Sequence, residues 1–314
     1  MKKSFVTFTT VTVLLFGLTS CITIIAASPS SDWPDHKTIT ASKKYETKNI
    51  TTSEFNAIST SSSVNVIYTQ ATGEPSVEIY APDNVIDYIS VEVKGKTLVV
   101  GMTKNIRIKG QHKKEVHVSA PAVDNLKASS SGDIILKNGL TATGKIGMKA
   151  SSSGDIKSND NISCTTLTLS ASSSGNIELK NISCTDLSAQ ASSSGDIDLS
   201  GKCENATYKV SSAGDIKARN LKAVNVKAET CSSGDIDLSG ECENATYKAS
   251  SSGDIRAKNL KAINVKAETC SSGDISCHVS GKLFGKASSG GEIFYKGNPS
   301  EIDFSQKKGL KKID

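Results

Sequence analysis

The chain has 314 residues, a formal net charge of +5, 5% aromatic residues and a single tryptophan. So few large side chains are unusual for a compact core of this length, and the apolar content comes instead from regularly placed Ile, Val, Leu and Ala. The sequence also has no basic cluster interleaved with aromatic residues, which argues against nucleic-acid binding. We therefore expect a thin, elongated core built by stacking, and no nucleic-acid partner.

The first 20 residues have the features of an export signal. Two lysines precede an apolar run over residues 5–18, which is too short to span a membrane as a helix. The run ends in LTSC at residues 18–21, which resembles the lipobox of a bacterial lipoprotein signal. An ordinary secretory signal with a chance cysteine is the alternative. We expect residues 1–20 to be removed and Cys21 to be acylated, which anchors a protein to a membrane without spanning it.

The composition changes several times along the mature chain. Residues 21–53 are rich in Ser, Thr and Lys with little periodicity, which predicts a lipid-anchored flexible tether. From residue 54 onward apolar and polar residues alternate, which is the pattern of strands. We expect irregular strands over 54–125, regular coils over 126–293 and a C-terminal cap over 294–305. A basic tail that we expect to be solvated follows over 306–314.

A six-residue motif, SSSGDI at residues 151–156, recurs through the second half of the chain. Its eight copies keep one glycine, at intervals of 19 to 22 residues, and a degenerate ninth copy reads SSGGEI. A period near 20 residues is typical of a solenoid. Residues 195–233 and 234–272 differ at only six positions, which indicates a duplicated two-coil unit. Because glycine allows a positive φ, we predict that a structural turn is formed at Gly132, Gly154, Gly175, Gly195, Gly214, Gly234, Gly253 and Gly273.

Residues at even offsets from each repeat glycine are apolar or small, and those at odd offsets are polar. The residue two positions after the glycine is always Ile. This period of two, without a period of 3.6, predicts an all-β fold: a single-stranded parallel β-helix with about 20 residues per coil and the even offsets inside. Outward charges should alternate in sign between neighbouring coils, as in the column Lys209, Glu229, Lys248 and Glu268.

Three segments carry a resemblance to a known family: FNAISTSSSVNVIYTQ at 55–70, VHVSAPAVDNLKASSSGDI at 116–134 and YKGNPSEI at 295–302. They resemble the bacterial family of putative auto-transporter adhesins with a head GIN domain. The resemblance places such a domain over residues 54–305. It implies a right-handed β-helix related in shape to pectin lyases, with Gly-Ser-Gly-like turns, and a role in adhesion. This chain departs from the pattern in its Ser-Ser-Gly-Asp turns and its many cysteines, for which the family offers no role.

An acidic column follows the repeat glycines and is a candidate cation site. Stacked carboxylates repel one another, and Ca²⁺ prefers such oxygen ligands. The alternative is that each Asp accepts hydrogen bonds from backbone N–H groups of the turn. We favour the turn role, because Asn176 and Glu292 fill the same position and the GGxGxD spacing of Ca²⁺-binding β-rolls is missing. We expect no cofactor or metal, and the weak candidates are Asp133, Asp155, Asp196, Asp215, Asp235, Asp254 and Asp274.

The sequence argues against catalysis. A serine lies two residues before each of the eight repeat glycines, but a nucleophilic serine needs a histidine and an acid nearby. His278 is the only histidine within the repeats. Polysaccharide lyases with this general shape need a single cluster of acids, Lys and Arg, whereas the duplication makes the outer face periodic. We expect no catalytic residue; a carbohydrate-binding or polysaccharide-degrading protein is the alternative.

Seven cysteines remain in the mature chain besides Cys21. Cys164 and Cys184 are one coil apart, so they could stack within disulfide reach. Cys231 and Cys270 are two coils apart, ~9.6 Å at the usual strand spacing, which is too far for a disulfide. Free thiols or one disulfide are the expectation.

Together these features predict a non-catalytic cell-envelope lipoprotein, either an adhesin or a structural scaffold that presents a repetitive surface. The expected partners are a membrane, through the lipid anchor, and an unidentified protein or glycan. Association with further copies of the chain is an open alternative. The lipobox and the family resemblance favour the outer membrane of a Gram-negative bacterium.

Overall fold

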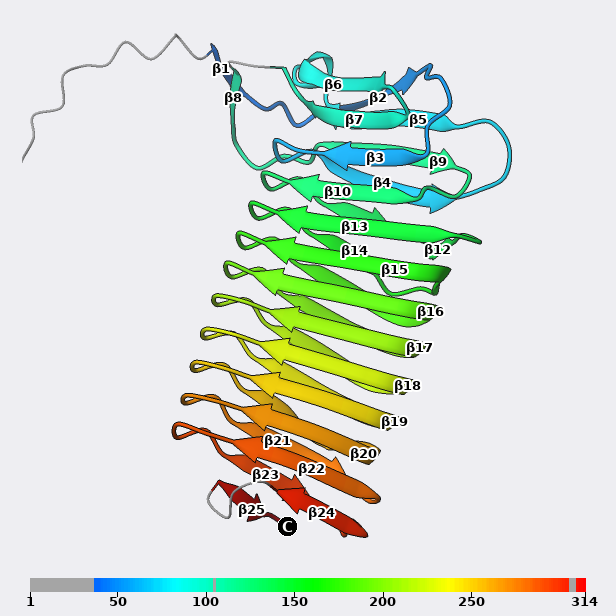
Figure 1. The fold of residues 1–314 in the computed structure, drawn as a ribbon. Coiled ribbons are helices and arrows are strands. Elements are labelled where there is room, and N and C mark those ends of the chain that lie inside the picture. The colour runs from blue at the N-terminus through cyan, green and yellow to red at the C-terminus, as the bar shows by residue number, and fades with distance from the viewer. Residues whose placement is uncertain (1–36, 104–105, 305–308) are drawn as a thin grey trace, which may run out of the picture. The chain divides into compact units, whose positions relative to one another are not determined.

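The protein is described by a computed structural model over residues 37–103, 106–304 and 309–314. Strands account for 65% of it and helix for about 1%, and the chain winds through about nine turns of roughly 20 residues each (Figure 1). The predicted all-β fold, a parallel β-helix, is confirmed. Within the described ranges no helix is long and apolar enough to cross a membrane. The predicted signal segment, Cys21 and the first part of the tether lie outside them.

The N-terminal strands combine parallel and antiparallel pairing. Their bounds are β1 Lys37–Thr40, β2 Tyr45–Ile50, β3 Ala57–Thr60, β4 Asn65–Gln70, β5 Ser76–Pro82, β6 Ile89–Lys94, β7 Thr97–Met102, β8 Ile106–Lys109 and β9 Glu115–Ala120, with a 3-10 helix η1 over Ile86–Tyr88. β2, β5 and β9 pair antiparallel in that order, and β6 and β7 form an antiparallel hairpin. β3 and β4 begin the parallel stack, because they pair in parallel with the first repeat strands.

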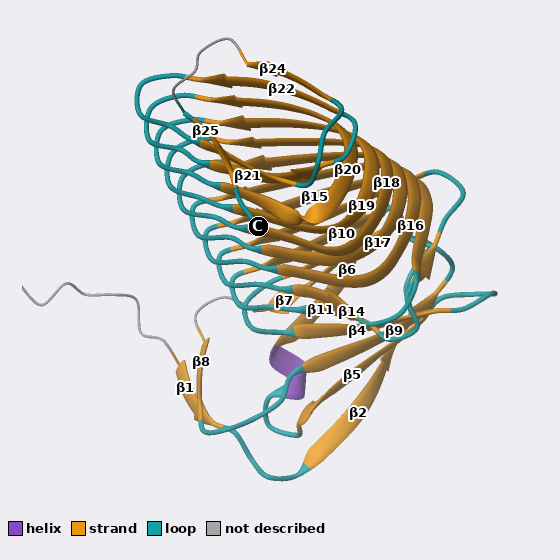
Figure 2. Ribbon diagram, turned by 90° about the horizontal axis from the view of Figure 1, so that it is seen from below, coloured by secondary structure: helices purple, strands orange, loops and turns teal. Residues whose placement is uncertain are grey.

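The repeat strands stack in parallel, coil on coil. Their bounds are β10 Asn125–Ser129, β11 Ile134–Leu136, β12 Leu140–Thr141, β13 Lys145–Ser151, β14 Ile156–Ser158, β15 Ile162–Ser172, β16 Ile177–Ser192, β17 Ile197–Val210, β18 Ile216–Thr230, β19 Ile236–Ala249, β20 Ile255–Thr269, β21 Ile275–Val279, β22 Lys282–Ala287, β23 Ile293–Lys296, β24 Glu301–Phe304 and β25 Leu310–Lys312. From β16 to β20 one bent strand runs from each turn to the next. Figure 2 shows the turns aligned along one edge of the stack.

The structure corrects both ends of the predicted organisation. Residues 37–50 were expected to belong to the flexible tether, but they contain β1 and β2, and β2 pairs along its whole length with β5. The basic tail was expected to be solvated, but β25 pairs in parallel with β23. Lys311 Nζ also donates to Glu292 Oε2 at 2.7 Å. Both segments are polar because each forms an outer strand, and burial of one side needs few apolar residues.

The core is a set of stacked columns. Ile177 in β16 lies beside Ile197 in β17, which in turn lies beside Ile216 in β18. All nine isoleucines at this repeat position are at most 1% exposed. Full burial of such a side chain stabilises a protein by roughly 1.5–3 kcal/mol. The predicted inward orientation of the even offsets is confirmed, and the hydrophobic effect acts along the whole stack.

The turn of each coil is made by its serines, which corrects the predicted role of the glycine. In the first four copies both serines before the glycine have positive φ, for example 51° at Ser152 and 62° at Ser153. The Gly154 N–H donates to the Ser151 carbonyl at 3.0 Å, as in a type I′ turn. None of the eight repeat glycines, all within the described ranges, has a positive φ. Backbone freedom is therefore not why glycine occupies this position.

Glycine is required because the turns of adjacent coils pack backbone against backbone. A Cβ on Gly154 would lie 2.5 Å from the Ser129 nitrogen and 2.7 Å from the Gly132 oxygen of the preceding coil. In the first coil Val64 takes the equivalent position, in register with Gly132. No turn of this kind precedes it, because β7 and β9 pack there instead. The side chain is excluded by the preceding coil and not by the local conformation.

This assignment predicts opposite effects for two substitutions in one turn. Gly154→Ala should lower the free energy of unfolding by about 1–3 kcal/mol, as overpacking does. Ser152→Gly, which supplies glycine where φ is positive, should stay within about 0.5 kcal/mol of the native chain or gain stability. Urea unfolding followed by far-ultraviolet circular dichroism measures both. A tolerated Gly154→Ala beside a destabilised Ser152→Gly would contradict the assignment.

Candidate functional site

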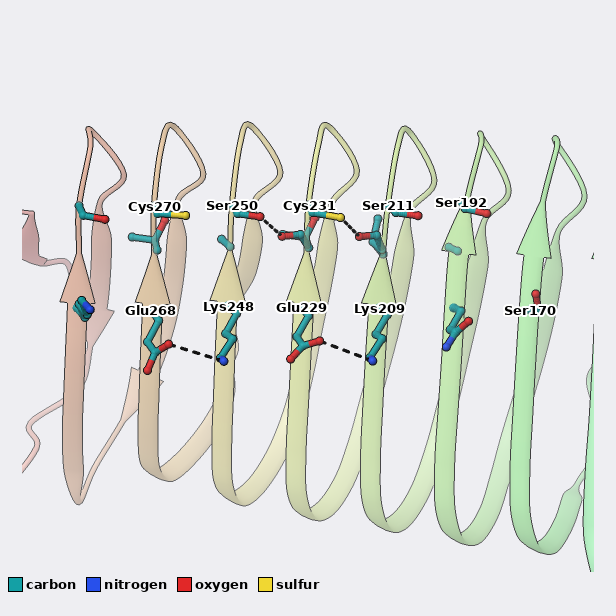
Figure 3. A pocket seen from close by; sticks show the side chains of 18 residues that line it. Ser170, Ser192, Lys209, Ser211, Glu229, Cys231, Lys248, Ser250, Glu268 and Cys270 are labelled. Carbon is teal, nitrogen blue, oxygen red and sulfur yellow. Dashed lines mark hydrogen bonds and ion pairs between the residues drawn. The ribbon is translucent and has the colours of Figure 1, made fainter.

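A groove follows the solenoid beside its turns and is the main concave surface of the repeats (Figure 3). Its volume is about 700 Å³, and it crosses seven coils between Ser170 and Ser288. Its lining comes from three repeat positions, namely five, four and three residues before the repeat glycine. The lining residues are Ser170, Gln190, Ala191, Ser192, Lys209, Val210, Ser211, Glu229, Thr230, Cys231, Lys248, Ala249, Ser250, Glu268, Thr269, Cys270, Lys286 and Ser288.

Charges of alternating sign form one wall of the groove. Lys209 Nζ lies 3.8 Å from Glu229 Oε2, and Lys248 makes the same contact with Glu268. The strand register places these residues side by side in successive coils, which confirms the predicted alternation. A hydrogen bond from Lys227, in the same strand, lowers the pKa of Glu229. The wall is therefore charged at neutral pH but carries almost no net charge along its length.

Serine and cysteine side chains form the rim, three residues before each glycine. The Ser250 hydroxyl donates to the Thr230 carbonyl at 3.2 Å, and the Cys231 thiol lies 3.7 Å from the Val210 carbonyl oxygen. Cys231 and Cys270 are exposed free thiols. A complete coil separates them, in agreement with the prediction that they cannot pair with each other.

The turns beside the groove differ from those of the earlier coils. In the copies led by Ser211, Cys231, Ser250 and Cys270, only the serine two residues before the glycine has a positive φ. The strand ladder instead continues to the rim: Cys231 N–H donates to the Val210 carbonyl at 3.1 Å. Within residues 106–304 no hydrogen bond from the chain reaches the carbonyl oxygens of these four rim residues. The groove therefore offers a row of backbone acceptors.

The acidic column lies beside the turns and makes a continuous hydrogen-bond ladder. Asp215 shows both of its contacts: its Oδ1 accepts the Asp235 N–H at 3.0 Å, and its carbonyl accepts the Ile197 N–H at 2.9 Å. Nine such side-chain contacts, of 2.9 to 3.2 Å, run from Asn65 to Glu292. Asn176 continues the ladder, since its amide oxygen accepts as a carboxylate does. The column holds adjacent coils together.

The remaining carboxylate oxygens face basic side chains rather than one another. Asp155 pairs with Lys157 at 3.0 Å, and Arg256 approaches Asp235 at 2.7 Å and Asp254 at 3.3 Å. Burial raises the pKa of Asp133, as expected for a partly desolvated carboxylate. Among the described residues no three His, Cys, Asp or Glu side chains converge as a metal site would require. The Asp positions act as stacked hydrogen-bond acceptors in this geometry.

His278 does not approach the turn serines. It lies in β21, in register with Lys261 on one side and Lys296 on the other. Burial and these two lysines lower its pKa. The structure thus gives the serine column no histidine partner within the described ranges.

Comparison with known proteins identifies the family. A family model described as "Putative auto-transporter adhesin, head GIN domain" matches residues 54–237 and 222–299, more than half of the chain. The chain belongs to this family. The two matched ranges overlap in the duplicated unit, as expected where one coil can align with either of two positions. No curated protein is significantly similar to the chain.

Several solved structures resemble the chain at low sequence identity. A putative adhesin from Parabacteroides distasonis is 18% identical with a TM-score of 0.50. Putative adhesins from Parabacteroides merdae and Bacteroides fragilis are 19% and 24% identical, with TM-scores of 0.48 and 0.33. Each comparison covers 88% of this chain and 100% of the other. At these identities the likeness to the Parabacteroides distasonis protein concerns the fold alone.

Proposed function

We propose that this chain is a non-catalytic lipoprotein adhesin of the Gram-negative outer membrane, and that its groove binds an extended, uncharged glycan. The observation that carries the proposal is the groove itself, which continues over seven coils without a deep closed end. At ~4.8 Å per coil the groove is roughly 29 Å long. A linear polymer matches such a surface better than a compact small molecule does.

The charge pattern of the wall supports an uncharged ligand. Lys209, Glu229, Lys248 and Glu268 alternate and pair with one another, so a polyanion or a polycation would meet as much repulsion as attraction. A sugar hydroxyl both donates and accepts hydrogen bonds. It can donate to the rim carbonyls and to the glutamates, and can accept from the lysines. The same periodic lining supports binding over catalysis, because no coil carries a reactive group that its neighbours lack.

The membrane half of the proposal rests on Cys21 and the apolar run before it. Acylation there would leave the solenoid outside the bilayer at the end of a short linker. Cys21→Ser should therefore move the full-length protein from the membrane fraction to the soluble fraction. It should also abolish incorporation of a labelled fatty acid. A variant that stayed membrane-bound and labelled would contradict the anchor.

The groove is tested by filling it with a bulky side chain. Ser250→Trp should weaken binding to the glycan that a polysaccharide array identifies, by at least about tenfold, because the indole occupies the groove floor. Lys222→Trp is the matched control: its side chain is 72% exposed and outside the groove. Titration calorimetry measures both affinities, with circular dichroism as the test of folding.

Equal affinities for the two variants would place the ligand elsewhere. An affinity that fell steeply with added salt would indicate a charged ligand instead of a neutral one. If a screen returned only a protein ligand, with Ser250→Trp still blocking it, the groove would stand and the glycan would be wrong.

A further inference from the structure

Three cysteines lie next to one another in three successive coils. Cys164 of β15 is in register with Cys184 of β16, and Cys184 is in register with Cys203 of β17. Their offsets from the repeat glycines differ by one residue each, so counting along the sequence brings only the first two together. A register shift between Leu179 and Ile182 brings Cys203 alongside as well. The result is a row of three thiols on adjacent strands.

The geometry of adjacent strands suits a disulfide. Parallel strands place in-register Cα atoms ~4.8 Å apart, inside the range of roughly 4.4–6.8 Å that disulfides span. Cys203 is only 8% exposed, and Cys184 and Cys164 are half-buried. The thiols of Cys184 and Cys203 hydrogen-bond to each other, which raises the pKa of Cys184 and lowers that of Cys203. Burial raises the pKa of Cys164 to about 11.

We propose that Cys184 and Cys203 form a disulfide that cross-links two adjacent coils, and that Cys164 stays a free thiol beside it. The oxidant is a disulfide of low molecular weight or of an oxidoreductase. Two protein S–H bonds and the S–S bond of the oxidant break, one protein S–S bond forms, and the oxidant leaves as two thiols. The export included in the proposed function would supply an oxidising compartment.

The choice of pair follows from direct contact. Cys203 touches Cys184, whereas Cys164 acts on Cys184 only through its charge. The register shift between these two coils is also where a parallel ladder is least regular. A covalent link there fixes the register of all later coils relative to the earlier ones, and it restricts the unfolded chain.

Peptide mapping of the purified full-length chain tests the proposal directly. After oxidation with glutathione disulfide and alkylation, non-reducing digestion should give a linked Cys184–Cys203 peptide and an alkylated Cys164. Oxidation should raise the melting temperature by several degrees. Cys203→Ser should abolish that increase.

Cys242→Ser is the matched control, because Cys242 occupies the same repeat position as Cys203 in the second unit. It is buried to a similar extent, but its neighbours in register are Ala223 and Ala262. This variant should keep the linked peptide and the oxidation-dependent increase. A Cys164–Cys184 peptide, or alkylation of all three cysteines, would overturn the proposal. Mapping of the native chain decides this even if a variant fails to fold, and it is independent of any ligand or membrane.

Discussion

In-register stacking of each coil on its neighbour is the constraint on which the rest of this structure depends. At ~4.8 Å per coil, every side chain lies against the side chain at the same position of the next coil. A residue type can repeat only if it tolerates contact with a copy of itself or with a complementary partner. Isoleucine satisfies this in the core, where each copy covers the next and all are at most 1% exposed.

Polar positions meet the same constraint in two ways. The outer charged column avoids like-charge contact by alternation, as between Lys209 and Glu229. The Asp column does not alternate, and its carboxylates are kept compatible by what they accept. Each takes a backbone N–H from the next coil, as Asp196 does from Asp215 at 3.0 Å. A motif with the composition of a catalytic or cation-binding loop is thus used to join coils.

Regular periodicity made the fold class, the Ile column and the charge register predictable from sequence, because a period of two maps directly onto the two faces of a strand. Contacts between coils were less accessible. The exclusion of a side chain at Gly154 depends on backbone atoms of Ser129, which no local pattern reveals. The groove and the neighbourhood of Cys184 and Cys203 likewise depend on a changed turn and a shifted register. β2 was missed because its partner, β5, lies some 30 residues later in the chain.

The central claim is that the repeated motif is a structural joint whose Asp acts as a hydrogen-bond acceptor. The most direct test is the free energy of unfolding of Asp215→Asn and Asp215→Ala, measured with and without Ca²⁺. Asn keeps the acceptor oxygen and should resemble the native chain, as Asn176 already does in its own coil. Ala leaves the Asp235 N–H without its partner and should cost about 1–3 kcal/mol, and Ca²⁺ should change none of the three proteins. Equal losses in both variants, together with stabilisation of the native chain by Ca²⁺, would contradict the account.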